Sequence, residues 1–448
     1  MGRIKQKGLS SGQIVMGSFC LMILTGTFLL MLPFATSDGK GASFLDALFT
    51  ATSASCVTGL IVQNTATYWS WFGQFVIIAL IQVGGMGVVT MAFVLFVASG
   101  RKIGLKTRFV MQDSIAAPQV GGIIRMIDWI LKVTIAIELI AAVLLAVSFY
   151  PEYGLLKSIW MGIFHSISAF CNAGFDILGD TTPYISVVDY ASHLPINLIL
   201  TFLIIIGGIG FFVWEDIYRC GLHFRRYKLH TKLALQTTFA LLLIGFFFFF
   251  FLEFSRDDVW DLSLKDQIIA SWFQAVSPRT AGFNTVDLTK LAEPTVLFTV
   301  LLMLIGGSPG STAGGMKTTT LAELILCTKS VLRGEASVRC FGRTIPQRIL
   351  RNAVSITTLY ITLCIGAAMA ISVLEQVPIL TALYETASAV GTVGLTLGIT
   401  PQLGTVSRLI LIFLMYFGRV GGLTLIYVLA GSQAEDVAIF PKEEITIG

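Results

Sequence analysis

Charged side chains are scarce in this chain. Only 12% of its 448 residues are Asp, Glu, Lys or Arg, and 55% are hydrophobic, whereas a typical soluble domain is about 25% charged. The four histidines and seven cysteines are scattered, without a CxxC pair or metal-ligand spacing, which argues against a disulfide framework or a metal centre. Walker-type glycine loops and Rossmann fingerprints are also missing, so control by a nucleotide would need another chain.

Groups for enzymatic chemistry are likewise missing from the apolar segments. These segments contain no paired acids, no His/Cys cluster and no Ser-His-Asp arrangement, and Asp128, Lys132 and Glu138 are too isolated to form a site. A membrane enzyme is therefore the disfavoured alternative. The chain is expected not to be an enzyme and to carry no covalently bound cofactor.

Long apolar runs are the main feature that the sequence does contain. Several exceed the roughly 18 to 20 residues that span a bilayer, and the mean hydropathy is +0.82. They predict an all-α integral protein of the cell membrane, surrounded by the lipid bilayer. The first run, 14–34, follows three basic residues and could mimic a signal peptide. Its length and the lack of a small-x-small cleavage site favour a retained first helix.

One segment occurs four times along the chain at nearly equal intervals. Each copy is a short apolar stretch that ends in a tetrad with a final glycine, followed by a longer apolar stretch. The four tetrads, which we call filter segments, are 56–59, 171–174, 279–282 and 391–394. A second glycine feature follows each of them: Gly84-Gly85, Gly207-Gly208, Gly306-Gly307 and Gly418-Arg419.

The repeat predicts a specific architecture. Each unit has two long apolar runs and, between them, one run of roughly 10 to 14 residues, which is too short to cross and reads as a re-entrant half-helix. We expect eight transmembrane helices and four half-helices (43–55, 155–170, 265–277 and 378–390), arranged pseudo-fourfold around one pore. The predicted divisions are an N-terminal tail 1–11, repeats 12–99, 125–220, 231–331 and 348–430, cytoplasmic loops 100–124, 221–230 and 332–347, and a C-terminal tail 431–448.

Basic residues are concentrated in the two tails and the inter-repeat loops. The opposite side carries only Lys40, Lys157, Arg256, Lys265 and Lys290. The positive-inside rule then places both termini in the cytoplasm, as an even helix count requires. We interpret the basic loops as reporting topology, and nucleic-acid binding is not expected.

The tetrads have the pattern needed to bind a dehydrated cation. Such an ion needs replacement oxygens, which rings of backbone carbonyls supply beside half-helix ends, and glycine adopts the required positive φ without a Cβ penalty. The alternative is that these glycines only allow close helix packing, but four tetrads in equivalent places favour a pore. The predicted filter is Cys56, Val57, Thr58, Gly59, Cys171, Asn172, Ala173, Gly174, Arg279, Thr280, Ala281, Gly282, Gly391, Thr392, Val393 and Gly394. The predicted K⁺ ligands are the carbonyls of Val57, Thr58, Asn172, Ala173, Thr280, Ala281, Thr392 and Val393.

The closing span of the third repeat is interrupted by ten residues with five glycines and a proline, which cannot remain a regular helix. These are Gly306, Gly307, Ser308, Pro309, Gly310, Ser311, Thr312, Ala313, Gly314 and Gly315. A packing kink is one interpretation. The more specific interpretation is a gating loop that lies across the pore on the cytoplasmic side of the filter.

Two arginines fall at membrane depth, where a charge is costly and by default functional. Arg419 takes the slot of the second glycine in the other repeats. It could contact the loop and repel ions, or it could be a structural residue paired with a buried acid such as Glu138. Arg279 is expected to be a structural donor that holds filter backbone.

Four segments (46–60, 164–175, 273–284 and 384–395) resemble the Ktr/Trk/HKT superfamily of potassium transporters, and within it the bacterial KtrB-type membrane subunits. The resemblance covers nearly the whole chain. It implies the filter above and an intramembrane gating loop at 306–315. Sodium-selective plant relatives replace the first filter glycine with serine, whereas this chain keeps glycine at all four positions, which favours potassium. Cys56 and Cys171 depart from the hydroxyl or amide side chains that relatives often have.

The resemblance also implies partners. These are a second copy of the chain in a homodimer and a cytosolic KtrA-type RCK regulatory ring that binds nucleotide, with 440–447 as a contact. The expected function is potassium uptake through a gated pore. A sodium-permeable or sodium-coupled member of the superfamily remains an alternative, and Na⁺ as an activator stays open. A secondary transporter with inverted repeats is disfavoured because all four units have the same orientation.

Overall fold

The computed structural model describes residues 11–87, 123–179, 184–256 and 258–421. Within these ranges, four helices are long and apolar enough to cross a membrane: Gly12–Leu30, Ile124–Phe170, Leu229–Glu253 and Gln347–Glu375. They correspond to the opening helices of the four predicted repeats. The predicted tail 431–448, the contact 440–447, the tail 1–11 except for its last residue, and most of the loop 100–124 lie outside the described residues.

Each opening helix is followed by a shorter helix that matches a predicted half-helix. The third opening helix ends in a π-helical turn, and the two helices of the second repeat run on as α6, interrupted at Gly154 with φ 70°. The opening helices are α1 (Ser11–Leu30), α6 (Ile123–Phe170, first part), α9 (Leu229–Phe248, continued by η4, Phe249–Glu253) and α13 (Gln347–Glu375). The half-helices are α2 (Phe44–Ser55), the second part of α6, α10 (Leu264–Val276) and α14 (Ile379–Gly391).

Two of the half-helices begin with the same capping pattern. Ser43 accepts a hydrogen bond from Asp46 N, and Ser263 accepts one from Asp266 N. A serine cap followed by an acid in the first turn satisfies free N–H groups and favours the positive end of the helix dipole. The sequence therefore fixes where these half-helices start, and their carboxyl ends meet the filter segments.

Each half-helix and filter segment is followed by a closing helix. The closing helices are α3 (Trp71–Met86), α7 (Leu194–Ile209), α11 (Glu293–Leu304) and α15 (Thr405–Val420). Three of them end at a glycine with almost the same backbone: Gly87 (φ 85°, ψ 132°), Gly210 (φ 96°, ψ 140°) and Gly421 (φ 91°, ψ 129°). After Gly210, α8 (Phe211–Cys220) leaves α7 at an angle of 92°. Positive φ is open to glycine but ends a right-handed helix, so the second closing span is broken at Gly210.

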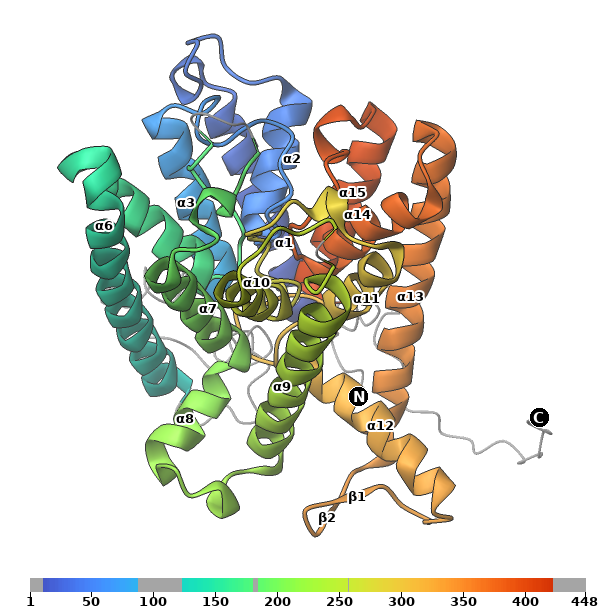
Figure 1. Cartoon of the computed structure of the whole chain (residues 1–448). Coiled ribbons are helices and arrows are strands. Elements are labelled where there is room, and N and C mark those ends of the chain that lie inside the picture. The colour runs from blue at the N-terminus through green and yellow to red at the C-terminus, as the bar shows by residue number, and fades with distance from the viewer. Residues whose placement is uncertain (1–10, 88–122, 180–183, 257, 422–448) are drawn as a thin grey trace, which may run out of the picture.

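The four units pack in cyclic order (Figure 1). Each closing helix contacts the half-helix of the following unit: α3 contacts α6, α7 contacts α10, α11 contacts α14, and α15 returns to α2. Contacts between opening helix and half-helix, such as α1 with α2 and α13 with α14, hold each unit together. The chain therefore closes on itself around the ends of the half-helices.

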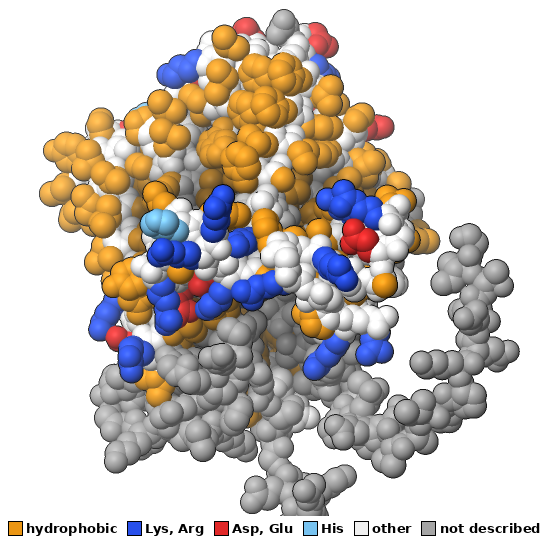
Figure 2. All heavy atoms as spheres, turned by 90° about the horizontal axis from the view of Figure 1, so that it is seen from below, with side chains coloured by type: hydrophobic (Ala, Val, Ile, Leu, Met, Phe, Trp, Pro, Cys, Tyr) orange, Lys and Arg blue, Asp and Glu red, His pale blue; other side chains and the backbone are white. Residues whose placement is uncertain are grey.

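Basic side chains gather at the end of the molecule opposite the half-helix starts. Figure 2 shows this face, with many Lys and Arg side chains around the described loops. It is formed by α8, by α12 (Thr318–Leu332) and by a short hairpin of β1 (Arg339–Cys340) and β2 (Arg343–Thr344), in which Arg339 pairs with Thr344. The described basic residues of the predicted cytoplasmic loops thus lie on one face.

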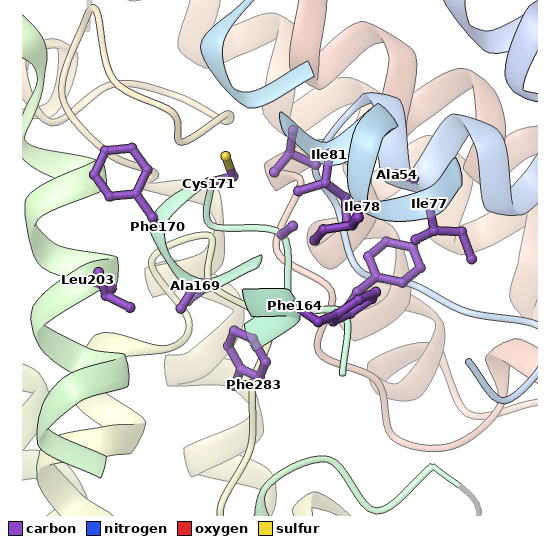
Figure 3. Close-up of a cluster of buried hydrophobic side chains, with 14 of the residues drawn as sticks. Ala54, Ile77, Ile78, Ile81, Phe164, Ala169, Phe170, Cys171, Leu203 and Phe283 are labelled. Carbon is purple, nitrogen blue, oxygen red and sulfur yellow. The ribbon is translucent and has the colours of Figure 1, made fainter. Parts of the chain in front are cut away.

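The apolar core surrounds the filter segments. One buried cluster joins α3, the second half-helix and α7, and another joins α11, α13, α14 and α15. Figure 3 shows part of the first cluster, where Phe170 lies beside Cys171 and Phe164 lies toward Ile77 and Ile78 of α3. Phe283, from beyond the third filter segment, belongs to the same cluster. This packing fixes the backbone of the segments from outside.

Candidate functional site

The four filter segments share one unusual backbone conformation. Their second residues have positive φ although none is glycine: Val57 (56°), Asn172 (59°), Thr280 (69°) and Thr392 (50°). Their final glycines are also positive: Gly59 (92°), Gly174 (67°), Gly282 (80°) and Gly394 (96°). A left-handed residue with a side chain costs about 1–2 kcal/mol, and such strain persists where the surroundings impose it, commonly at functional sites.

The final glycines form a closed ring. A Cβ added to Gly59 would collide with the carbonyl oxygen of Ala173, and one added to Gly394 would collide with that of Thr58. The same holds for Gly174 against Ala281 O and for Gly282 against Val393 O. Each glycine therefore touches the third-residue carbonyl of the next segment, in the order one, two, three, four and back to one. Only residues without a Cβ allow this approach.

A serine near the end of each half-helix holds its filter segment. Ser53 Oγ accepts from Gly59 N (3.1 Å), and Ser388 Oγ accepts from Gly394 N (3.0 Å). Ser168 Oγ donates to Phe175 O (2.7 Å), and Ser277 Oγ donates to Phe283 O. These bonds tie each filter segment to its own half-helix, so the position of the half-helix determines the position of the segment.

The second glycine feature of each repeat (84–85, 207–208, 306–307 and 418–419), which we call the doublet, explains how the closing helices approach the filter segments so closely. In three repeats, a Cβ on the first glycine of the doublet would collide with the carbonyl oxygen of the residue before the filter segment. The pairs are Gly84 with Ser55, Gly207 with Phe170, and Gly418 with Val390. The doublets thus let three closing helices contact the carboxyl ends of the half-helices directly.

The predicted loop 306–315 lies against the filter segments. Gly306 N donates to Met316 O (2.7 Å), which joins the two ends of the loop. Thr312 Oγ1 donates to Phe170 O (3.0 Å) at the end of the second half-helix, and a Cβ on Gly314 would collide with Thr392 Oγ1. The loop therefore contacts the end of the second half-helix and the fourth filter segment.

The end of α7 holds the other side of this loop. Ser308 N donates to Gly208 O (2.8 Å), Thr312 N donates to Gly207 O (3.2 Å), and Phe211 N donates to Gly310 O (2.7 Å). The carbonyls that close a helix have no partner within it, and here the loop supplies donors to them. The break at Gly210 exposes the groups that bind the loop.

Arg419 joins the loop to the end of α3. Its Nη1 donates to Thr312 O, and its Nη2 donates to Gly84 O and, at 2.9 Å, to Gly85 O. A cation at the carboxyl end of a helix is favoured by the helix dipole. Glu138, the acid considered as a partner, instead accepts from Gln82 Nε2 (3.1 Å). Of the two interpretations of Arg419, the loop contact is the one that the structure shows.

Arg279 does not hold filter backbone as expected. Its Nη2 donates to Thr238 Oγ1 (3.4 Å) on α9, and its Nε has no partner among the described residues. Arg279 lies just beyond the end of α10, and the only hydrogen bond that the described residues give its guanidinium goes to α9 rather than to filter backbone. The expectation was wrong because position in the tetrad does not set the direction of the side chain.

Lys317 is a site residue that sequence reasoning missed. Its Nζ donates to Ala313 O (2.8 Å) and Gly314 O (3.2 Å), so the ammonium group binds the last turn of the loop. The signal was present, since a lysine two residues after an intramembrane glycine run is costly. Together with Arg419, it brings two positive charges to the loop.

The convergent groups of the site are main-chain groups. In the described part of the chain, no group of three or more His, Cys, Asp or Glu is placed to hold a metal ion. What the repeats do bring together is a ring of glycines and carbonyl oxygens. Such oxygens suit a hard monovalent cation that gives up its water.

A protein family, two relatives and one solved structure are similar to nearly the whole of this chain. Residues 10–435 match the family described as TrkH, cation transport protein. The chain is 39% identical to the potassium/sodium uptake protein NtpJ of Enterococcus hirae, over 99% of this chain and 98% of that protein. It is 41% identical to the Ktr system potassium uptake protein B of Bacillus subtilis, with the same coverage. Its structure is similar to that of the potassium transporter TrkH from Vibrio parahaemolyticus, with a TM-score of 0.72 and 22% identity over 96% of this chain and 86% of that one.

Proposed function

Because this chain belongs to the TrkH family of cation transport proteins, we propose that it takes up potassium ions across the cell membrane. Relatives 41% and 39% identical to it are named for potassium uptake and for potassium/sodium uptake. The observation that carries the proposal is the closed ring of four glycines, each against a carbonyl oxygen of the next repeat. These relatives are named as uptake proteins, which supports a transporter rather than an enzyme.

The proposed selectivity filter is formed by the second and third carbonyls of the four filter segments. Positive φ at the second and fourth residues of every segment supports it, because oxygens can surround an ion only where the backbone leaves regular helix and lines a cavity. Carbonyls, rather than side chains, would bind K⁺. The differing side chains of Val57, Asn172, Thr280 and Thr392 are consistent with that.

The proposed architecture is a pseudo-fourfold pore of four repeats, with both termini in the cytoplasm. Cyclic packing of closing helices on half-helices supports the fourfold arrangement. The basic face in Figure 2 supports the orientation, since Lys and Arg are concentrated in cytoplasmic loops. In this arrangement the half-helices begin on the outer side and end near the membrane centre.

The loop 306–315 is the proposed gate. This role is supported by its contacts with Phe170 O and Thr392 and by its attachment to Arg419, which lie where the closing helices end. In this position it would obstruct ions that leave the filter toward the cytoplasm. Arg419 and Lys317 would add a positive barrier while the loop is closed.

Regulation by a cytosolic nucleotide-binding subunit is part of the proposal. The sequence has no nucleotide fingerprint of its own, and the basic face offers a surface for a soluble partner. A homodimer with one pore in each copy is proposed from the family resemblance.

A sodium-permeable or sodium-coupled transporter is the second candidate. The name of the Enterococcus hirae relative favours it, because that protein is described as taking up potassium and sodium. Uptake measured with K⁺ alone, with Na⁺ alone and with both distinguishes selectivity, permeability and activation by Na⁺.

The filter is tested by Gly59→Ser in a bacterium that lacks its own potassium transporters. Because a Cβ at this position collides with Ala173 O, the carbonyl ring must widen, and we expect the ratio of K⁺ to Na⁺ uptake to fall about tenfold, which corresponds to about 1.4 kcal/mol. Gly39→Ser is the control, since Gly39 also has positive φ (71°) but nothing within 4 Å of an added Cβ. An unchanged ratio in Gly59→Ser, with normal membrane insertion, refutes the filter.

A further inference from the structure

One position in the half-helices carries a buried polar side chain in all four repeats. It lies three residues before the serine that holds each filter segment, and its occupants are Thr50, His165, Gln274 and Glu385. All four are buried, with exposed fractions of 1% or less. Polar groups are kept in such surroundings only where hydrogen bonds compensate for the lost water. Because a buried polar side chain recurs at this one position, we expect these side chains to have a shared structural role.

In the second repeat this side chain reaches the backbone beyond the filter segment. His165 Nδ1 lies 2.8 Å from Met161 O, and its Nε2 lies 3.4 Å from Ile177 N. A carbonyl only accepts, so Nδ1 carries the proton and Nε2 is free to accept from Ile177. Ile177 is the third residue after the filter glycine Gly174.

The fourth repeat forms the same contact with a carboxylate. Glu385 Oε1 accepts from Leu397 N (3.1 Å) and from Thr396 Oγ1, and Oε2 accepts from Thr400 Oγ1 (2.7 Å). Leu397 is the third residue after Gly394, so it is equivalent to Ile177. Two different side chains therefore bind the same backbone amide in the two repeats.

The two contacts lie in opposite repeats, because the units follow one another in cyclic order. In the third repeat, Gln274 and the equivalent outer residue Thr285 have side-chain atoms without partners among the described residues. Direct support of this amide is thus shown for the second and fourth repeats. Both contacts reach the chain just outside the filter glycines.

We propose that Glu385 and His165 are positioning residues that brace the outer end of the selectivity filter from behind and thereby set its discrimination between K⁺ and Na⁺. This proposal rests on the potassium-uptake function proposed above. The brace fixes the segment after each filter glycine, so the outermost carbonyl ring cannot widen or rotate to suit a smaller ion. Glu385, with three donors from one outer loop, is the stronger brace.

The test uses Glu385→Ala and Glu385→Gln in the full-length protein, expressed in the potassium-transport-deficient bacterium. KM and maximal rate are measured for K⁺ and for Na⁺ separately. Glu385→Ala removes every contact to the outer loop, and we expect the K⁺/Na⁺ uptake ratio to fall about tenfold. Glu385→Gln keeps an oxygen that accepts from Leu397 N, and its ratio should stay within about threefold of wild type.

Glu375→Ala is the matched control. Glu375 also binds a backbone amide and a hydroxyl, Gly404 N (2.9 Å) and Ser407 Oγ (2.5 Å), but at the start of α15 rather than behind a filter segment. It should lower thermal stability in detergent without changing the ion ratio. If Glu385→Ala does not insert, Thr400→Val tests a partial loss of the brace. It removes the bond to Glu385 Oε2 and the bond to Thr396 Oγ1 but leaves both Oε1 contacts in place, so it should lower the ratio by a smaller factor.

Several outcomes overturn the brace. One is a wild-type ratio in Glu385→Ala or, where that variant fails to insert, in Thr400→Val. Another is an equal loss in Glu385→Gln and Glu385→Ala, which would assign the effect to negative charge instead of bracing. The proposed function fails separately, if the wild-type protein does not restore potassium uptake. A changed ratio in Gly59→Ser with an unchanged one in Glu385→Ala rejects only the brace.

Discussion

Removal of the Arg419 guanidinium should release the loop 306–315. Of its three hydrogen bonds, those to Gly84 O and Gly85 O join two closing helices, and only the bond to Thr312 O joins the loop. If the loop moves when the pore opens, this last bond is the one that differs between the closed and open states. Arg419→Ala therefore destabilises the closed state by the value of one charge-assisted bond, about 1.5–3 kcal/mol.

A loss of about 2 kcal/mol changes an equilibrium constant about 30-fold. We therefore expect potassium flux through the Arg419→Ala variant to rise by up to that factor, until the open state dominates. The assay is K⁺ flux into liposomes that contain the purified protein. Arg419→Lys separates the two effects of the residue, because it keeps the charge but cannot reach all three carbonyls, and it should give a smaller rise.

Arg408→Gln is the control for the loss of an arginine from α15. Arg408 lies near the start of this helix, where it binds Asp46 Oδ1 (2.8 Å) and carbonyls of its own repeat, far along the helix from the loop. Its loss should leave flux per inserted molecule unchanged. Flux at the wild-type level in Arg419→Ala would show that the guanidinium does not hold the loop closed.

Two further predictions concern the outer side. Asp46→Asn weakens an ion pair whose side chains are only 14% and 18% exposed, so the free energy of unfolding should fall by about 1–3 kcal/mol; an unchanged melting temperature in detergent would contradict this. In the loop after the second filter segment, burial raises the pKa of Asp176 to about 6. As external pH falls through that value the carboxylate loses its charge, so potassium uptake should weaken, and Asp176→Asn should lack this pH step if Asp176 attracts the incoming cation.

The sequence predicts most of the filter backbone but not all of it. Glycine is recognisable where positive φ is needed, so Gly59 and its three equivalents are found by pattern alone. The second residue of each segment was missed as a left-handed position, because Val57, Asn172, Thr280 and Thr392 share no side-chain type. Their conformation is imposed by the half-helix end and the serine behind it, which are tertiary effects.

The ends of the closing helices were missed although a signal existed. The chain reads Gly-Gly-x-Gly before the breaks at Gly87 and Gly210, and Gly-Arg-Val-Gly before Gly421. In the third repeat Pro309 takes the place of that last glycine, and proline cannot adopt a φ near +90°. The turn moves to Gly310 instead (φ 68°). The third closing helix also ends earlier than the others, at Leu304 and before its doublet, so Pro309 lies within the long loop and not at its start.

The buried polar position in the half-helices was hidden by a shift in spacing. Counted back from the filter glycine, Thr50, His165 and Glu385 align with Phe273, because the third repeat has one residue fewer between its serine and its glycine. Counted from the serine, the partner is Gln274. The hydrogen bonds from Ser277 and Ser388 to their own filter segments show that these serines are equivalent, so the repeats are correctly aligned by the serine.

The cyclic packing has a consequence for the order of assembly. The half-helix α2 is made early in synthesis, yet the helix α15 that covers it, and the Arg408 that binds its Asp46, come more than three hundred residues later. Contacts between residues so distant in sequence form late, because a long chain segment must first be enclosed. The half-helix of the first repeat therefore lacks its contacts with α15 until the fourth repeat has been inserted into the bilayer. A chain that ends before the fourth repeat would have three filter segments but could not close the ring around the ion path.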